Sequence, residues 1–419
     1  MAFRVGAIHI LITANVTLET DHFILLDSVY SPEKRFKTFD KTYPFCAFAL
    51  AFGLIYPNPD NIRMRQFLAV MVVGFDSMGL FWFACNVIEN LSERDIYNLI
   101  RNLTIGILVL LFLFKLFYVT YITKDFSILL DKISYDLLRG NELDDDYKEI
   151  YDEYIKKGKV GQLCWIIIPI VMSCQFPIYA GMQTVIEYFR GGYNKYMVHE
   201  MKLTFMKEKQ YETPYYEMVF LYNCINSISL MPNFAGFDGS FCIATTHLRL
   251  KLKLMVHKIR RAFKDSRNKF ELRSKIKEAI KDHQDALVFY ADVQRVYGAW
   301  LFCVFLITAV AISFNIYLLY LSHTLDPKYT IYALSGVVHM YTPCYFSSVL
   351  LESTDSFFWI YCTPWESARD PVVTKLLVFV IARSQNPLFL TGQGMVYFNM
   401  QLFLSMLQTS YSFFTIITA

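Results

Sequence analysis

Charge is scarce in this sequence and unevenly distributed. Only 18% of the 419 residues are Asp, Glu, Lys or Arg, and 55% are hydrophobic, whereas soluble domains contain about 25% charged residues. Residues 384–419 carry no charge at all. Several charge-poor stretches reach the roughly 20 residues that a hydrocarbon core requires. This composition excludes a soluble globular protein and predicts an all-α protein with several membrane-spanning helices.

The sequence also lacks the motifs of common enzymes and metal sites. It has no P-loop, no GxSxG and no GxGxxG, and His199-Glu200 lacks the second histidine of a zinc-binding helix. The odd number of cysteines includes no CxxC pair, so we interpret them as small buried hydrophobic residues. They lie at positions 46, 85, 164, 174, 224, 242, 303, 344 and 362. We expect no enzyme, no cofactor, no metal and no nucleic-acid partner.

Seven charge-poor stretches predict membrane-spanning helices. They are residues 66–88, 102–122, 160–186, 218–246, 296–322, 330–351 and 394–418. An eighth apolar run, residues 372–381, is too short to span a membrane and contains Lys375. We expect it to form a buried or interfacial helix that leads into the last span.

Basic residues predict the orientation of these spans. The N-terminal segment and the second, fourth and sixth loops hold 31 of the 40 Lys and Arg residues, the other loops and the C-terminus hold 8, and Lys115 lies inside a span. Because basic residues stay on the cytoplasmic side, we expect the N-terminus inside the cell and the C-terminus outside. The predicted regions are a cytoplasmic segment (1–65), helices 1–4 (66–246), a cytoplasmic basic helical loop (247–295), helices 5 and 6 (296–351), a cytoplasmic segment with a short helix (352–393) and a closing helix (394–419).

The fourth loop is the most basic region of the chain. Residues 246–290 contain no Gly or Pro, and apolar residues recur every three or four positions, so we expect helix throughout. These helices either present a basic face to anionic lipid or pack together into a cytosolic anchor. We favour the anchor.

Two charges fall inside predicted spans, Asp76 in the first and Lys115 in the second. A bare charge at the centre of a membrane costs about 2.5–3.5 kcal/mol on insertion scales. Counted from the outer ends of two adjacent antiparallel helices, both charges lie at similar depth. We predict an Asp76–Lys115 ion pair; the alternative is that Lys115 extends to the cytoplasmic surface while Asp76 meets hydroxyl groups.

The last third of the chain carries motifs in a distinctive order. Tyr361-Cys-Thr-Pro-Trp365 precedes the short helix, Arg383-Ser-Gln-Asn-Pro387-Leu and Thr391-Gly392 follow it, and Thr409-Ser-Tyr411-Ser-Phe-Phe lies in the closing helix. With these motifs and this topology, the chain resembles the insect odorant receptor family. G-protein-coupled receptors are the alternative, although they have the opposite orientation, and the Tyr of their NPxxY motif is missing after Asn386-Pro387.

The resemblance implies a cation channel that volatile ligands open directly. Four subunits surround a central pore, and odorant-tuned subunits assemble with a shared co-receptor. Co-receptors carry a long insertion in the fourth loop, and this chain has no room for it there. The TYxxxxxQF ending of the related gustatory receptors is also absent. The chain is therefore expected to be a tuning subunit in the plasma membrane of olfactory neuron dendrites, in contact with membrane lipids.

The closing helix has a candidate pore face. Leu407, Ser410, Phe414 and Thr418 share one side of a helix with 3.6 residues per turn. Because channels can close by dewetting an apolar ring, we predict that Phe414 forms the constriction between Ser410 and Thr418. The alternative is that Phe414 packs against a neighbouring helix.

The resemblance also implies a ligand pocket among the second, third, fourth and sixth spans. Small volatile ligands favour a mostly apolar site with a few polar groups. We expect His339, a histidine inside the membrane, to hydrogen-bond an ester or carbonyl oxygen of the ligand; the alternative is a hydrogen bond between helices. For the aromatic residues, the alternative to ligand contact is simple helix packing. The predicted odorant-binding residues are Phe176, Tyr179, Met182, Gln183, Tyr216, Val219, Tyr222, Tyr332, Ser335, His339 and Met340.

Overall fold

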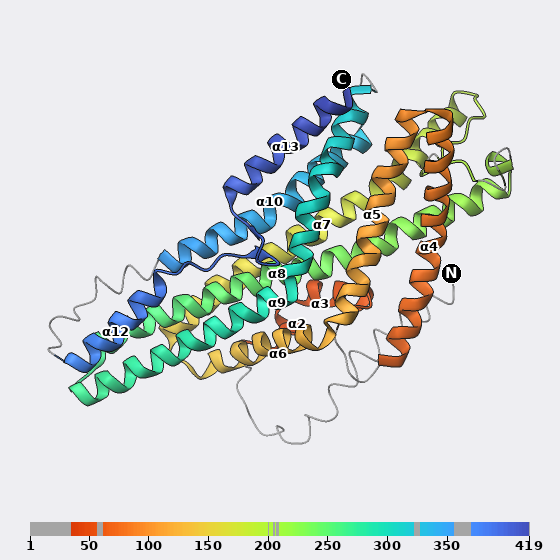
Figure 1. The fold of residues 1–419 in the computed structure, drawn as a ribbon. Helices are drawn as coiled ribbons and strands as arrows, with labels where there is room; N and C mark the ends of the chain where they lie inside the picture. The colour runs from red at the N-terminus through yellow and green to blue at the C-terminus, as the bar shows by residue number, and fades with distance from the viewer. Residues whose placement is uncertain are drawn as a thin grey trace, which may run out of the picture.

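The computed structural model describes residues 35–56, 62–199, 201–203, 206, 209–321, 327–355 and 370–418. Most of the predicted N-terminal segment and the Tyr361–Trp365 motif lie outside these residues. The described chain is almost entirely helical, which confirms the all-α prediction (Figure 1). Its helices run roughly along one long axis, so the fold is a helical bundle.

The elements follow one another in this order: α2 (Phe39–Thr42), α3 (Pro44–Phe52), α4 (Ile62–Glu93), α5 (Ile96–Tyr121), α6 (Thr123–Arg139), η1 (Gly140–Glu142), α7 (Asp145–Phe189), η2 (Lys209–Tyr211), α8 (Tyr215–Asp265), α9 (Lys269–Leu321), α10 (Pro327–Asp355), α12 (Pro371–Ser384), β1 (Thr391–Gly392), β2 (Val396–Tyr397) and α13 (Met400–Thr418). The two strands pair antiparallel.

Each of the seven predicted spans coincides with a helix: α4, α5, α7, α8, α9, α10 and α13. The last helix begins at Met400 rather than at residue 394, because residues 391–397 form the β1–β2 hairpin. The predicted short helix is α12, which starts at a proline and is capped by Asp370, whose carboxylate accepts a hydrogen bond from the Val372 amide.

Four of the described helices are long and apolar enough to cross a membrane: α5, α7, α9 and the Arg63–Glu93 part of α4. The helices α8, α10 and α13 do not meet this measure. On α4, Phe67, Val70 and Met71 point outward, and few residues of this helix are buried. An apolar outer surface of this kind suits contact with lipid rather than water.

We use two names for parts of the bundle. The anchor bundle comprises α2, α3, α6, α12 and residues 145–160, 246–265 and 269–295 of α7, α8 and α9. The membrane bundle comprises α4, α5, α10, α13 and the remainder of α7, α8 and α9. Because α7, α8 and α9 continue through both, the two bundles share their central helices (Figure 1).

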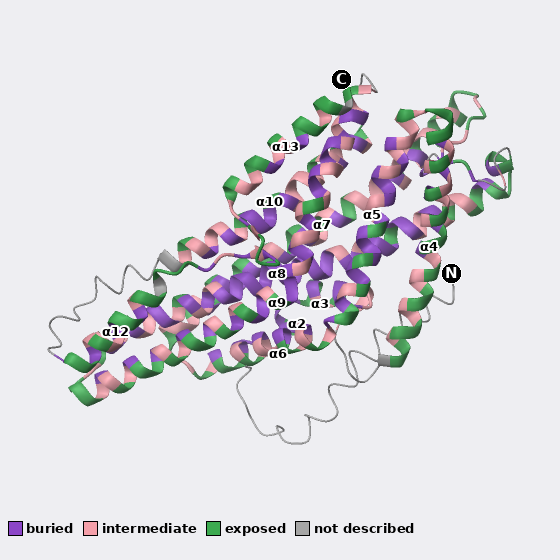
Figure 2. Cartoon of the chain, in the orientation of Figure 1, coloured by how far each residue is buried: buried purple, intermediate pink, exposed green. Residues whose placement is uncertain are grey.

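The middle of α8 is the centre of the core. Residues 235–248 are buried without interruption, and Figure 2 shows this burial as a continuous purple region around α8 and α9. The backbone of α3 crosses α8 at Gly236, where an added Cβ would lie 2.7 Å from the Leu50 amide nitrogen. Glycine therefore permits the close approach of these two helices.

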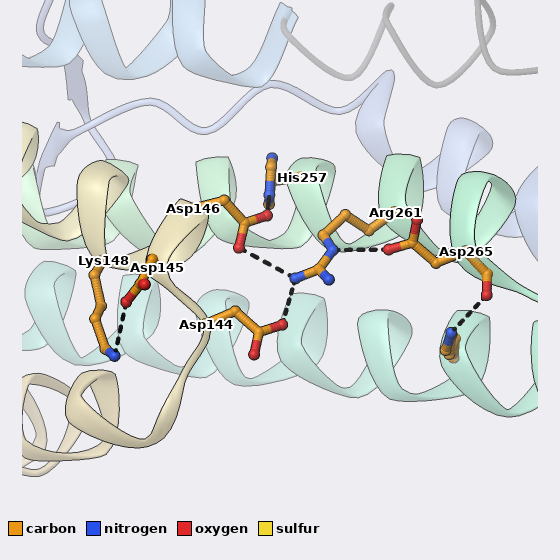
Figure 3. Close-up of polar contacts among 8 residues, drawn as sticks. Asp144, Asp145, Asp146, Lys148, His257, Arg261 and Asp265 are labelled. Atoms are coloured by element: carbon orange, nitrogen blue, oxygen red, sulfur yellow. Dashed lines mark hydrogen bonds and ion pairs between the residues drawn. The ribbon is translucent and has the colours of Figure 1, made fainter.

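The predicted helical stretch 246–290 is present as the end of α8 and the start of α9. Its apolar residues face inward, with Ile259 and Ile276 fully buried, so the helices pack together as the anchor alternative requires. Charged residues cover the outside. Figure 3 shows Arg261 of α8 between Asp144, Asp146 and Asp265, and its Nη1 lies 2.6 Å from Asp144.

A second polar cluster in the anchor bundle joins α6 to α8. Asp136 accepts hydrogen bonds from His247 at 3.0 Å and from Lys251 at 2.6 Å. Burial by itself would raise the pKa of Asp136, but these two partners lower it to about 2. The carboxylate thus stays charged and ties the two helices together.

Candidate ligand cavity and pore helix

A cavity of about 100 Å³ lies inside the membrane bundle, between α5, α7, α8, α9 and α10. Its wall is mostly apolar. The lining residues are Ile107, Leu108, Leu111, Trp165, Ile168, Pro169, Met172, Ser173, Leu230, Met231, Phe234, Ile307, Thr308, Ala311, Ile312, Asn315, Tyr332, Ser335, Gly336 and His339. A largely apolar wall with a few polar groups is typical of small-molecule sites.

Three of the predicted binding residues line this cavity, and all come from α10. They are Tyr332, Ser335 and His339. The hydroxyl group of Tyr332 donates to the Thr104 carbonyl at 3.3 Å, and that of Ser335 donates to the Ile331 carbonyl at 2.8 Å. The sixth predicted span therefore contributes to a pocket wall, as the sequence suggested.

The other predicted binding residues do not line this cavity. Phe176 packs with Val198 and Tyr332 in a separate cluster. The hydroxyl groups of Tyr216 and Tyr222 donate to the carbonyls of Tyr196 and Phe75. The ring of Tyr179 makes a cation–π contact with the Lys328 ammonium, and Met340 belongs to the main core. Met182 is exposed, and Gln183 and Val219 are partly buried. For these eight residues, ligand contact stays a prediction without support from the cavity.

The contribution of α9, the fifth span, was not predicted from the sequence. Thr308, Ala311, Ile312 and Asn315 come from this helix. Asn315 interrupts an apolar run, and a polar residue inside the membrane is a functional candidate, so this signal was available in the sequence. The family resemblance implied a pocket on the second, third, fourth and sixth spans, and so did not include α9.

Next to the cavity lies a buried ion pair that differs from the predicted one. The Nζ of Lys115 is 2.8 Å from Oδ2 of Asp238 on α8, and Lys115 is fully buried. Asp76 instead accepts hydrogen bonds from Asn226 at 2.9 Å and from Ser229 at 3.0 Å. The predicted Asp76–Lys115 pair is therefore wrong, because α5 also packs against α8, which carries the matching carboxylate at the same depth.

Aromatic rings enclose this ion pair. The Lys115 ammonium lies 4.0 Å from the ring centre of Phe234 and 3.9 Å from that of Trp300. The indole nitrogen of Trp300 donates to Oδ1 of Asp238 at 2.8 Å. Cation–π contacts and an added hydrogen bond compensate for desolvation where water is absent.

His339 connects the ion pair to the cavity. It lines the cavity, and its Nε2 lies 3.5 Å from Oδ2 of Asp238. Its ring also packs against Trp165, with the ring centres 5.4 Å apart. This contact between α10 and α8 agrees with the alternative for His339, a polar contact between helices, and a hydrogen bond from His339 to a ligand oxygen stays a prediction.

The final helix, α13, packs against α9 and α10 on one side. Ser410 is 1% exposed, and its backbone carbonyl accepts a hydrogen bond from Ser313 of α9 at 2.8 Å. Phe414 packs edge-on against Tyr320 of α9. Leu407 is partly buried on the same side, whereas Thr418 is exposed.

Ser410 is buried within its own chain and so does not fit the predicted pore face, whereas a role of the partly buried Phe414 in the pore stays a prediction. The alternative for Phe414, packing against a neighbouring helix, is the observed arrangement. The opposite face of α13 is exposed, as Figure 2 shows by its green outer side. A row of polar residues follows this face at spacings of three and four: Gln401, Ser405, Gln408, Ser412 and Thr415. We call this row the polar stripe.

These features define the class of the protein: a helical membrane protein with a mostly apolar internal cavity. Comparison with known proteins gives the family. The profile described as 7tm Odorant receptor matches residues 95–411. Odorant receptor 47a of Drosophila melanogaster is 23% identical over 386 residues, which cover 88% of this chain and 95% of that receptor.

Odorant receptor 10 of Aedes albopictus is also 23% identical, over 219 residues. These residues cover 49% of this chain and 56% of that receptor, so this match spans only about half of its length. The fold matches two solved structures of the insect olfactory receptor OR5 from Machilis hrabei. The structure with eugenol gives a TM-score of 0.72 and the other gives 0.73, each at 15% identity over 90% of this chain and 99% of that chain.

The chain belongs to the 7tm odorant receptor family. This membership confirms the resemblance found in the sequence, the seven-helix membrane fold and the prediction that the protein is not an enzyme.

Proposed function

We propose that the chain is an odorant-tuned subunit of a ligand-gated, non-selective cation channel. It would assemble with co-receptor subunits into a heterotetramer in the plasma membrane of olfactory neuron dendrites, with its N-terminus in the cytosol and its C-terminus outside. A small, mostly apolar volatile would bind in the cavity of the membrane bundle and open a central pore. Members of its family and the eugenol complex of the Machilis receptor support this proposal.

The observation that carries the proposal is the polar stripe of α13. A helix whose outer face met only lipid would present apolar side chains there. The stripe instead presents amides and hydroxyl groups on the face opposite the packing contacts with α9. A ring of such helices, one per subunit, would border a hydrated path, and because the stripe carries no charge it would discriminate poorly among cations.

The arrangement of α9 supports a direct connection between ligand and pore. Ile312 and Asn315 of α9 line the cavity, and Ser313 between them bonds the backbone of α13 at Ser410. A ligand that shifts α9 would therefore move α13 through a hydrogen bond and the packing of Phe414 on Tyr320. Differential contact of this kind is what a ligand needs to change a conformational equilibrium.

Cysteine substitution tests the pore assignment. We expect the variants Ser405→Cys, Gln408→Cys and Ser412→Cys, each co-expressed with a co-receptor, to lose more than half of their odorant-evoked current after a positively charged thiol reagent is applied. The added charge would lie in the ion path. Current recording measures the effect, and the unsubstituted chain gives the background from the native cysteines.

The matched control is Ser410→Cys, because this position is buried against α9. Its current should resist the reagent. The assignment of the stripe fails when all three stripe variants reach the surface and respond to odorants but none is modified, or when Ser410→Cys is the sensitive one.

A further inference from the structure

The cavity contains a buried hydrogen-bond acceptor without a donor. Asn315 of α9 lines the cavity and is only 1% exposed. Among the residues that the structure describes, its Oδ1 has no hydrogen-bond partner. A buried polar atom without a partner loses the hydrogen bonds it had in water, and folded proteins seldom tolerate this without a reason.

The orientation of this amide is set by its other end. The Nδ2 of Asn315 donates to the Ala311 carbonyl at 2.7 Å. Turning the amide round would place two oxygen acceptors against each other, so the group next to Ala311 must be the NH₂ group. Oδ1 is therefore the atom that is left to accept a hydrogen bond.

Two neighbouring polar groups of the cavity also offer acceptors. Tyr332 and Ser335 use their hydroxyl protons on backbone carbonyls of the protein, which leaves only lone pairs on their oxygens. The Nε2 of His339 lies toward the Asp238 carboxylate of the protein. Asn315, Tyr332 and Ser335 thus offer acceptors, and their protons are engaged within the protein. Two further hydroxyl side chains, Ser173 and Thr308, also line the cavity.

From this pattern we propose that the cavity selects small ligands that carry a hydroxyl donor, alcohols or phenols, and that Asn315 Oδ1 accepts the ligand's hydrogen bond. The inference rests on the proposed function and names the ligand class of the same site. A cavity of about 100 Å³ is of the order of an engineered apolar cavity of about 150 Å³ that holds benzene. The ligand is therefore a small one, with its carbon skeleton against the apolar wall.

Matched ligand sets test the proposal in cells that express the chain with a co-receptor. Each set contains three compounds of the same skeleton: an alcohol, the matching ketone or aldehyde, and the hydrocarbon with a methyl group in place of the hydroxyl group. One set is cyclohexanol, cyclohexanone and methylcyclohexane. Another is benzyl alcohol, benzaldehyde and ethylbenzene. Linear sets are included as well. We expect the half-maximal concentration for the alcohol to be about tenfold lower than for its two partners in the sets that fit, because only the alcohol donates a hydrogen bond.

The variant Asn315→Leu should remove this preference while keeping a similar side-chain volume. We expect the alcohol to lose about tenfold in potency and the hydrocarbon to lose nothing. The matched control is Asn233→Leu, since Asn233 is equally buried but does not line the cavity, and it should keep the alcohol preference. If Asn315→Leu does not reach the surface, Asn315→Ala serves in its place, with surface labelling as the check.

Several outcomes would overturn the proposal. Equal potency within every set would show that the site does not recognise the hydroxyl donor of the ligand. Higher potency of the ketones would show that the site donates a hydrogen bond to the ligand instead. An alcohol preference that survives in the Asn315 variant would show that Asn315 Oδ1 is not the atom that accepts the ligand's hydrogen bond. A surface-expressed channel that no ligand of any class opens would instead contradict the proposed function, so the two failures are distinguishable.

Discussion

The membrane bundle and the anchor bundle place charged and apolar residues in opposite positions. In the membrane bundle, Lys115 and Asp238 are buried against each other, and apolar side chains such as Val70 point outward. In the anchor bundle, Ile259 and Ile276 are buried while Arg261 forms its ion pairs at the surface. The helices α7, α8 and α9 pass through both regions, so the pattern changes along single helices. The surrounding medium, rather than the type of secondary structure, decides which residues face inward.

The difference predicts that charges matter unequally in the two regions. A buried pair holds two desolvated groups, so removing one partner leaves the other uncompensated, whereas a surface pair exchanges its partner for water. Ion pairs with similar N–O distances should therefore contribute very different amounts to stability in the two bundles.

The largest effect is expected for Lys115→Met. It leaves the Asp238 carboxylate buried without its cation, and loss of one partner of a buried pair costs about 3–5 kcal/mol. We expect little of this variant to reach the cell surface, as measured by surface labelling. The double variant Lys115→Met with Asp238→Leu should recover much of the loss, and a double variant as poor as the single one would contradict this account.

A smaller effect is expected for Gly236→Ala, at the crossing of α3 and α8. The added methyl group meets backbone atoms of α3 that cannot move aside as a side chain can. Overpacking of this kind costs about 1–3 kcal/mol, which a lowered thermal midpoint of the purified protein in detergent would report.

Gly74→Ala on α4 is the matched control, since an added Cβ there has no neighbour within 4 Å among the described residues. It should be neutral or slightly stabilising, because alanine favours helix over glycine by about 1 kcal/mol. Equal losses for the two variants would mean that the helix crossing does not depend on glycine.

The smallest effect is expected for Arg261→Gln in the anchor bundle (Figure 3). Its three carboxylate partners lie at the surface, where exposed pairs contribute about 0.2–1 kcal/mol each at most and salt screens them. We expect a small drop in thermal midpoint at low salt that disappears at high salt. A loss as large as that of Lys115→Met would remove the contrast between the two bundles.

Much of the fold was predictable, because long apolar runs report directly on helices. The seven spans, the short helix before the last one and the helical stretch of the fourth loop depend on residues close in sequence. The boundary at Met400 was missed because the β1–β2 hairpin before it contains apolar residues that resemble the start of a span.

The candidate site was less predictable, because its residues come from five helices that are far apart in sequence. Tyr332, Ser335 and His339 were predicted because the family resemblance implied a pocket wall on the sixth span, where they are polar or aromatic residues. Asn315 was visible by the same criterion, but nothing in the local sequence shows that it borders the same cavity as His339.

The sequence by itself determined that this protein is a helical membrane protein of the odorant receptor family, since composition, periodicity and motif order are local properties. Only the tertiary structure decided that Lys115 pairs with Asp238, that the polar stripe of α13 is its exposed face and that α9 lines the cavity. Helical periodicity shows which residues share a face, but the partner of that face is set by packing between distant segments, and the chain order does not contain that information in readable form.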